Sequence, residues 1–130
     1  MKHLTPKEAW DYLQARPDAL FLDVRMEIEY LYVGHPIGVV HVPWYEYPEM
    51  QADPAAFVQR VKREGGREDR PVVLICRSGR RTVEAAEALE AAGFREVVNV
   101  LHGFEGDLDD QDHRGSVNGW RFEGLPWAQL

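Results

Sequence analysis

The one cysteine of the chain, Cys76, lies in a segment whose residue types suit the chemistry of a reactive thiol. Arg77, Arg80 and Arg81 follow it within five residues. Arginines and a helix N-terminus both favour the thiolate, which is the nucleophilic form of cysteine. Gly79 permits a positive φ, so that successive backbone N–H groups can point inward and bind an anion. The segment therefore predicts a stabilised thiolate inside an anion-binding loop.

A lone free cysteine is more commonly a buried structural residue that behaves as a small hydrophobe. That interpretation does not account for three neighbouring arginines, because an apolar core would not hold them. Ser78 adds a hydroxyl group that can donate a further hydrogen bond. We therefore favour the reactive cysteine.

A strand and a helix must hold this loop in place. Residues 72–75 are four consecutive aliphatic side chains, which is typical of a strand buried on both faces in a parallel sheet. The residues after the loop show the apolar spacing of a helix at Thr82, Ala85, Ala86 and Leu89. Cys76 is thus expected at the carboxyl end of a strand, where open α/β sheets bind ligands.

The remaining elements extend the same pattern. Thr5, Pro6 and Glu8 form a capping box with a proline in the first helical turn. A second helix is expected to begin at Asp53-Pro54, and further strands are expected over residues 19–24, 39–42 and 96–101. Large rings near the end of the chain, Trp120, Phe122 and Trp127, predict a tail that packs onto the domain. The alternation indicates a compact, doubly wound α/β fold with a mostly parallel sheet and helices on both faces.

The length of the chain, 130 residues, is typical of one domain, which we expect over residues 1–130. A formal charge of −7 disfavours binding to nucleic acid or to anionic membranes through a basic face. A single cysteine excludes an internal disulfide and suits a reducing compartment. Because neither a membrane-spanning apolar run nor the core of a signal peptide is present, we expect a cytoplasmic protein.

The cysteine segment resembles the C-x-x-G-x-R active-site loop of rhodanese-like sulfurtransferases. Similar stretches occur, in order, along nearly the whole chain: Leu22-Asp23-Val24-Arg25, Glu29-Tyr30, Gly34-His35, Gly38, Val42-Pro43, Gly93-Phe94, 97–101 with Gly103, and Gly124-Leu125-Pro126. The resemblance implies the compact rhodanese fold, present once.

The resemblance also implies a function. The Cys76 thiolate takes a sulfane sulfur from thiosulfate or a related small anionic donor, and the resulting persulfide passes it to a thiol or to cyanide. The implied substrate-binding residues are Arg77, Ser78, Gly79, Arg80 and Arg81, with Arg81 the first choice for direct contact. Asp23 and Arg25 are implied to brace the loop. The reaction needs neither a cofactor nor a metal.

Two other functions use the same residues. A persulfide carrier or partner-binding module, loaded by a protein donor, needs the same loop. A cysteine phosphatase or arsenate reductase of this fold needs C-x5-R, and here Thr82 stands where that arginine belongs. The loop is one residue short for phosphate, which favours sulfur transfer.

Several charged and aromatic groups allow two interpretations. Asp23, Arg25 and Glu29 suit a structural ion-pair network better than acid–base catalysis, which sulfur transfer does not require. His35 and His41 are expected to be hydrogen-bonded structural residues, because the chain lacks metal-ligand spacing. For the aromatic residues Trp44, Tyr45 and Tyr47 two roles are open: they either line a pocket or cover the sheet. The acidic stretch over residues 107–112 lacks the spacing of a calcium loop and is expected to be solvated.

Overall fold

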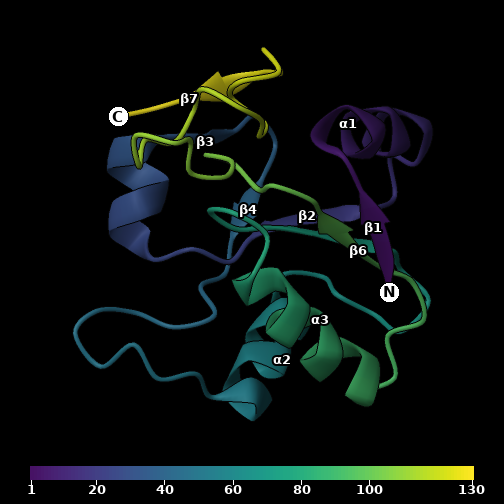
Figure 1. The fold of residues 1–130 in the computed structure, drawn as a ribbon. Helices are drawn as coiled ribbons and strands as arrows, with labels where there is room; N and C mark the ends of the chain where they lie inside the picture. The colour runs from purple at the N-terminus through teal and green to yellow at the C-terminus, as the bar shows by residue number, and fades with distance from the viewer.

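The computed structural model describes all 130 residues and centres on a five-stranded sheet (Figure 1). Its strands are β1 (Lys2–Leu4), β2 (Leu20–Asp23), β4 (Val40–His41), β5 (Val72–Ile75) and β6 (Val97–Val100). They are arranged in the order β1-β6-β5-β2-β4, and every neighbouring pair is parallel. The central strand β5 is buried along its whole length, as its aliphatic sequence predicts.

Helices cover both faces of the sheet, which confirms the predicted layers. Helix α1 (Pro6–Ala15) lies on one face, and α2 (Pro54–Arg63) and α3 (Arg81–Ala91) pack side by side on the other (Figure 1). Thr5 and Glu8 form the predicted capping box of α1, and Asp53 caps α2 through the amide of Ala56. None of these helices combines the length and apolar character of a membrane span.

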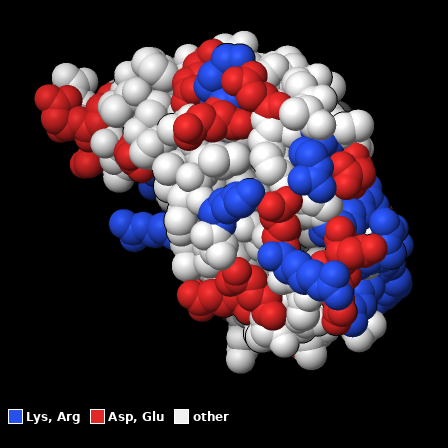
Figure 2. Space-filling model, turned by 90° about the vertical axis from the view of Figure 1, so that its right-hand side faces the viewer, with Lys and Arg blue, Asp and Glu red and all other residues white.

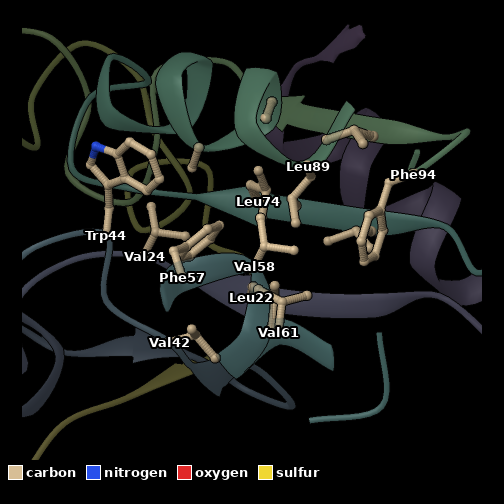
Figure 3. Packing of buried hydrophobic residues seen from close by; sticks show 14 of the residues in the cluster. Leu22, Val24, Val42, Trp44, Phe57, Val58, Val61, Leu74, Leu89 and Phe94 are labelled. Atoms are coloured by element: carbon tan, nitrogen blue, oxygen red, sulfur yellow. The ribbon is translucent and has the colours of Figure 1, made fainter. Parts of the chain in front are cut away.

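The sheet divides the hydrophobic core into two clusters. On the side of α2 and α3, Leu22 and Leu74 of the sheet pack with helix residues such as Phe57 (Figure 3). The Phe57 ring lies edge to face with the Trp44 ring, with 5.1 Å between the ring centres. On the side of α1, the fully buried Trp120 packs against Phe21. The tail therefore packs onto the domain, as predicted.

Phe122 and Trp127, the other two rings of the tail, differ from the predicted packing. The Phe122 side chain is 50% exposed, so only part of the predicted aromatic cover forms. Strand β7 (Trp127–Ala128) instead forms a small antiparallel sheet with β3 (His35–Pro36). This pairing joins the end of the chain to the segment after β2.

Two further elements were not predicted. Strand β1 has three residues and owes its existence to a ladder with β6, in which Lys2 pairs with Val98. The segment Glu29–Val33 forms a π-helical turn, η1, although its aromatic and β-branched residues favour strands. The predicted strand over residues 39–42 is shorter and consists of β4 alone.

The site sits where the chain direction through the sheet changes. From β2 the chain continues to β4 at one edge, whereas from the adjacent β5 it continues to β6 on the other side. Asp23 and Ile75 are register partners at the carboxyl ends of β2 and β5. Ligands of open α/β sheets bind at such a switch point, and Cys76 is the next residue after β5.

Candidate active site

The Cys76 sulfur lies beneath its own loop and accepts a backbone hydrogen bond there. The residue is 1% exposed. The Gly79 N–H donates to Sγ at 3.1 Å, and Gly79 adopts the expected positive φ, 100°. A side chain at this φ would be strained, which explains why glycine suits the position. The loop thus turns a backbone donor toward the sulfur.

Other amides of the loop are available to an anion. The N–H groups of Arg77, Ser78 and Arg80 make no hydrogen bond within the chain. Helix α3 begins directly after them at Arg81 and has eleven residues, so its positive end faces the loop. A loop of unpaired amides at a helix N-terminus can hold an anionic sulfur or an anionic ligand.

The three loop arginines have different environments. Arg77 and Arg80 are exposed and belong to no ion pair. Arg81 is largely buried and makes two bonds to Glu29, from Nη1 to Oε1 at 2.6 Å and from Nη2 to Oε2 at 2.8 Å. The pair uses two of the five N–H donors of the guanidinium, and direct contact between Arg81 and a substrate stays a prediction.

The pair with Glu29 fixes the charge of Arg81. Burial would raise the pKa of Glu29, but the hydrogen bonds and charge of Arg81 outweigh burial and hold that pKa below its usual value. Burial would likewise lower the pKa of Arg81, whereas Glu29 raises it. The Arg81 guanidinium also lies 5.4 Å from the ring centre of Tyr45. The loop's last arginine is thus a fixed positive charge.

Asp23 and Arg25 form a fully buried ion pair one strand away. Arg25 Nη2 donates to Asp23 Oδ2 at 2.6 Å and to the carbonyl of Gly34 at 2.5 Å. The guanidinium also lies 4.7 Å from the ring centre of Phe104, whose own N–H donates to the Cys76 carbonyl at 2.8 Å. Phe104 thus links the pair to the loop, and the bracing role of the pair stays a prediction.

A segment that sequence reasoning did not assign to the site holds the first part of the loop. The N–H groups of Phe104, Glu105 and Gly106 donate to the carbonyls of Cys76 and Arg77. Gly103 has a φ of 62°, and a Cβ there would lie 2.6 Å from the Arg77 carbonyl carbon. The signal in the sequence is the pair of glycines, Gly103 and Gly106, after the strand at residues 96–101.

Two buried polar residues were also missed as part of the site. The hydroxyl of Thr82 lies 3.6 Å from the Cys76 sulfur and donates to Asn99 Oδ1 at 2.5 Å. The sequence places Thr82 on the apolar face of a helix and predicts no contact between its hydroxyl and the sulfur. The signal for Asn99 is a lone amide within an otherwise aliphatic strand, because a buried polar group needs a partner.

The histidines and aromatic residues in and after η1 take structural positions. The Tyr30 ring stacks between His35 and His41, at centroid distances of 4.0 and 4.5 Å. Both imidazoles bond to backbone carbonyls, which confirms their expected role as hydrogen-bonded residues. Trp44 is buried and donates from Nε1 to Glu84, whereas Tyr47 is 75% exposed. Trp44 therefore covers the sheet, the Tyr45 ring lies beside Arg81, and Tyr47 lines an open pocket, so both predicted roles occur within the cluster.

Charge on the surface is mixed. Acidic and basic side chains are interspersed over the face drawn in Figure 2. Several surface charges form ion pairs, among them Lys2 with Glu96 and Lys7 with Asp11.

Known proteins are similar to this chain in sequence and fold. A family model described as "Rhodanese-like domain" matches residues 5–109. The crystal structure of Rv0390 from M. tuberculosis has a TM-score of 0.87 and 40% identity, covering 100% of this chain and 98% of that one. Thiosulfate sulfurtransferase GlpE of Actinobacillus succinogenes is 30% identical over 95% of this chain and 86% of its own length. Putative sulfur carrier protein YrkF of Bacillus subtilis is 38% identical, over 63% of this chain and 37% of its own length. The parallel sheet, the cysteine loop and these matches together show that the chain belongs to the rhodanese-like domain family.

Proposed function

We propose that the protein is a sulfurtransferase that carries a sulfane sulfur as a persulfide on Cys76. The observation that carries the proposal is the hydrogen bond from the Gly79 N–H to the Cys76 sulfur, at 3.1 Å, within a loop whose other amides are unpaired. Such donors stabilise negative charge on the thiolate, and equally on the outer sulfur of a persulfide. The distant relatives named as a thiosulfate sulfurtransferase and a sulfur carrier support the same chemistry.

The first half-reaction loads the cysteine. The Cys76 thiolate attacks the outer sulfur of thiosulfate and forms a new sulfur–sulfur bond. The old sulfur–sulfur bond of the donor breaks, and sulfite leaves with its electron pair. The total charge of −3 is the same on both sides, since a thiolate and a thiosulfate dianion become a persulfide anion and a sulfite dianion.

The second half-reaction unloads it. Cyanide or a thiolate attacks the outer sulfur of the Cys76 persulfide, and the Cys76 thiolate leaves. Covalent catalysis of this kind divides one transfer into two steps, so ping-pong kinetics are expected. No proton has to be moved by a side chain, which agrees with the structural positions of His35 and His41.

Arg77 and Arg80 are the groups proposed to attract the anionic donor. Both are exposed and free of carboxylate partners, on a protein with a net charge of −7. Arg81 contributes a fixed positive charge behind the loop, and the Ser78 hydroxyl is proposed as a further donor. Asp23 and Arg25 are proposed to support the loop through Phe104.

A persulfide carrier loaded by a protein donor is the second candidate. The likeness to a protein named as a putative sulfur carrier favours it, over 63% of this chain. Thiosulfate separates the two functions, because a small-molecule enzyme gains sulfur from it directly whereas such a carrier requires the protein donor. A phosphatase is disfavoured because Thr82, whose hydroxyl faces Asn99, stands where the phosphate-binding arginine would be.

Replacing the nucleophile tests the proposal. We expect Cys76→Ser to lower thiosulfate:cyanide sulfurtransferase activity by about three orders of magnitude or more, because no other thiol is present. Thermal unfolding of the variant checks that the fold is retained. Full activity in Cys76→Ser, or hydrolysis of p-nitrophenyl phosphate by the wild type at a rate comparable to sulfur transfer, would contradict the proposal.

A further inference from the structure

A chain of polar side chains leads from the buried Cys76 sulfur to the surface. Thr82 Oγ1 lies 3.6 Å from Sγ and 2.5 Å from Asn99 Oδ1. Asn99 Nδ2 in turn lies 3.1 Å from Nδ1 of His3. These four polar residues come from four segments, namely the loop after β5, α3, β6 and β1.

The packing of the sheet does not account for these groups. Cys76, Thr82 and Asn99 are 1%, 0% and 2% exposed, whereas His3 is exposed. Asn99 is the only polar residue of β6, and its strand neighbours are valines. A buried amide and hydroxyl lose their hydration, so aliphatic residues of similar size would serve the core better. This row of polar side chains therefore points to a role that serves the Cys76 sulfur rather than the stability of the fold.

A hydroxyl group has one proton, and this limits how the chain can be arranged. In the structure Thr82 donates that proton to Asn99 Oδ1, and Asn99 Nδ2 faces His3 Nδ1. This arrangement suits a Cys76 thiol, which can donate to Thr82 Oγ1. An anionic sulfur can only accept hydrogen bonds.

Turning the Asn99 amide over reverses every donor. Nδ2 then donates to Thr82 Oγ1, and the Thr82 proton is free to point at the sulfur. Oδ1 faces His3, where it accepts a hydrogen bond if Nδ1 of that ring carries a proton. A thiolate at Cys76 and a proton on His3 Nδ1 thus favour the same arrangement.

We propose that Thr82 and Asn99 are positioning residues that couple the ionisation of Cys76 to the protonation of His3. A proton on His3 Nδ1 orients the Asn99 amide, the amide orients the Thr82 hydroxyl, and the hydroxyl stabilises the thiolate. The coupling concerns the same sulfur as the proposed sulfurtransferase function and rests on it for its biological use. It predicts that the reactivity of Cys76 depends on a surface residue of β1.

Other charged groups surround His3 and the Cys76 sulfur, the two ends of the row of polar side chains. Near His3, the amino group of Met1 pairs with Glu90 of α3, and Lys2 pairs with Glu96 beside β6. Near the sulfur, Arg81 of α3 pairs with Glu29 of η1. At the adjacent end of β2, Asp23 pairs with Arg25.

The rate of alkylation by iodoacetamide, divided by its plateau at high pH, measures the thiolate fraction of Cys76, because the chain has no other cysteine and the plateau contains the effect of burial. We expect His3→Ala to slow alkylation about fivefold below the pH at which the thiol is half ionised, and to move that half-point upward. Thr82→Val should slow alkylation about tenfold, and Thr82→Ser should restore it because the hydroxyl is kept. His113→Ala is the matched control, since the ring of His113 makes no hydrogen bond within the chain.

Coupling must also act in the reverse direction. In Cys76→Ser, which carries no thiolate, the NMR titration of the His3 ring should move to lower pH, and that of the His113 ring should not. An unchanged alkylation profile in His3→Ala, together with an unchanged His3 titration in Cys76→Ser, would overturn the coupling. These two measurements decide the matter even if Thr82→Val does not fold.

The two proposals fail in different ways. If the wild type gains no sulfur from any donor but the alkylation and NMR shifts appear, the sulfurtransferase proposal is wrong and the coupling is supported. If the wild type gains sulfur but neither shift appears, the coupling is wrong and the transfer proposal is unaffected.

Discussion

The sulfur of Cys76 receives a hydrogen bond from a backbone N–H, and this contact depends on the residue type three positions later. Gly79 reaches a φ of 100°, which turns its amide toward the sulfur. Both residues could be identified from the sequence, because the requirement for glycine is local. The partner of Arg81 could not be identified in the same way, since Glu29 lies 52 residues earlier. Contact of Arg81 with a substrate stays a prediction, and the structure adds that a carboxylate holds its guanidinium.

The Arg81–Glu29 pair gives a prediction for acid stability. The folded pKa of Glu29 is lowered, so the pair contributes stability above the usual value near 4.5 and loses it as the pH falls through the lower folded value. We expect Glu29→Gln to reduce the free energy of unfolding by roughly 2–3 kcal/mol at neutral pH. This difference from the wild type should vanish in strong acid.

Urea unfolding of both proteins across the acidic range measures the effect. Glu27→Gln is a suitable control, because Glu27 is exposed and its carboxylate is in no ion pair. A difference between wild type and Glu29→Gln that stays constant down to strong acid would show that the ion pair is not its source.

The elements of the fold were predicted where a local pattern specifies them. Helix α1 has its capping box, α2 has its Asp-Pro start, and β5 is an unbroken aliphatic run. The elements that were missed depend on distant partners. Strand β1 exists through its ladder with β6, and η1 holds Tyr30 between two histidines despite a strand-like sequence. Such tertiary contacts override propensity.

The turn after β6 gives a prediction at this scale. Gly103 has both a positive φ and no room for a side chain, since a Cβ would lie 2.6 Å from the Arg77 carbonyl carbon. Gly124 has a similar φ, 74°, but nothing within 4 Å of its Cβ position. We expect Gly124→Ala to cost only about 1–2 kcal/mol from backbone strain.

Gly103→Ala is expected to cost more and to displace the loop, lowering sulfurtransferase activity per folded molecule by at least about tenfold. Thermal unfolding and activity assays on both variants test this comparison. If Gly103→Ala were no more harmful than Gly124→Ala, the close approach of the turn to the loop would not matter for the site.

In the molecule as a whole, the order of strands places the site. Two neighbouring strands, β2 and β5, end side by side while the chain leaves them in opposite directions. The parallel sheet with helices on both faces follows from the alternation of patterns, and its switch point follows from the topology. The polar chain through Thr82 and Asn99 could not be predicted, because it requires knowing that β6 lies beside β5 and β1.

The central claim is that Cys76 carries a transferable sulfur. Intact-mass analysis of the protein after exposure to thiosulfate tests it most directly, with Cys76→Ser in parallel. We predict that the wild type gains the mass of one sulfur atom, that cyanide removes this mass, and that Cys76→Ser never gains it. A wild type that stays unmodified with thiosulfate, polysulfide and a persulfide-bearing protein donor alike, or an equal gain in Cys76→Ser, would contradict the account.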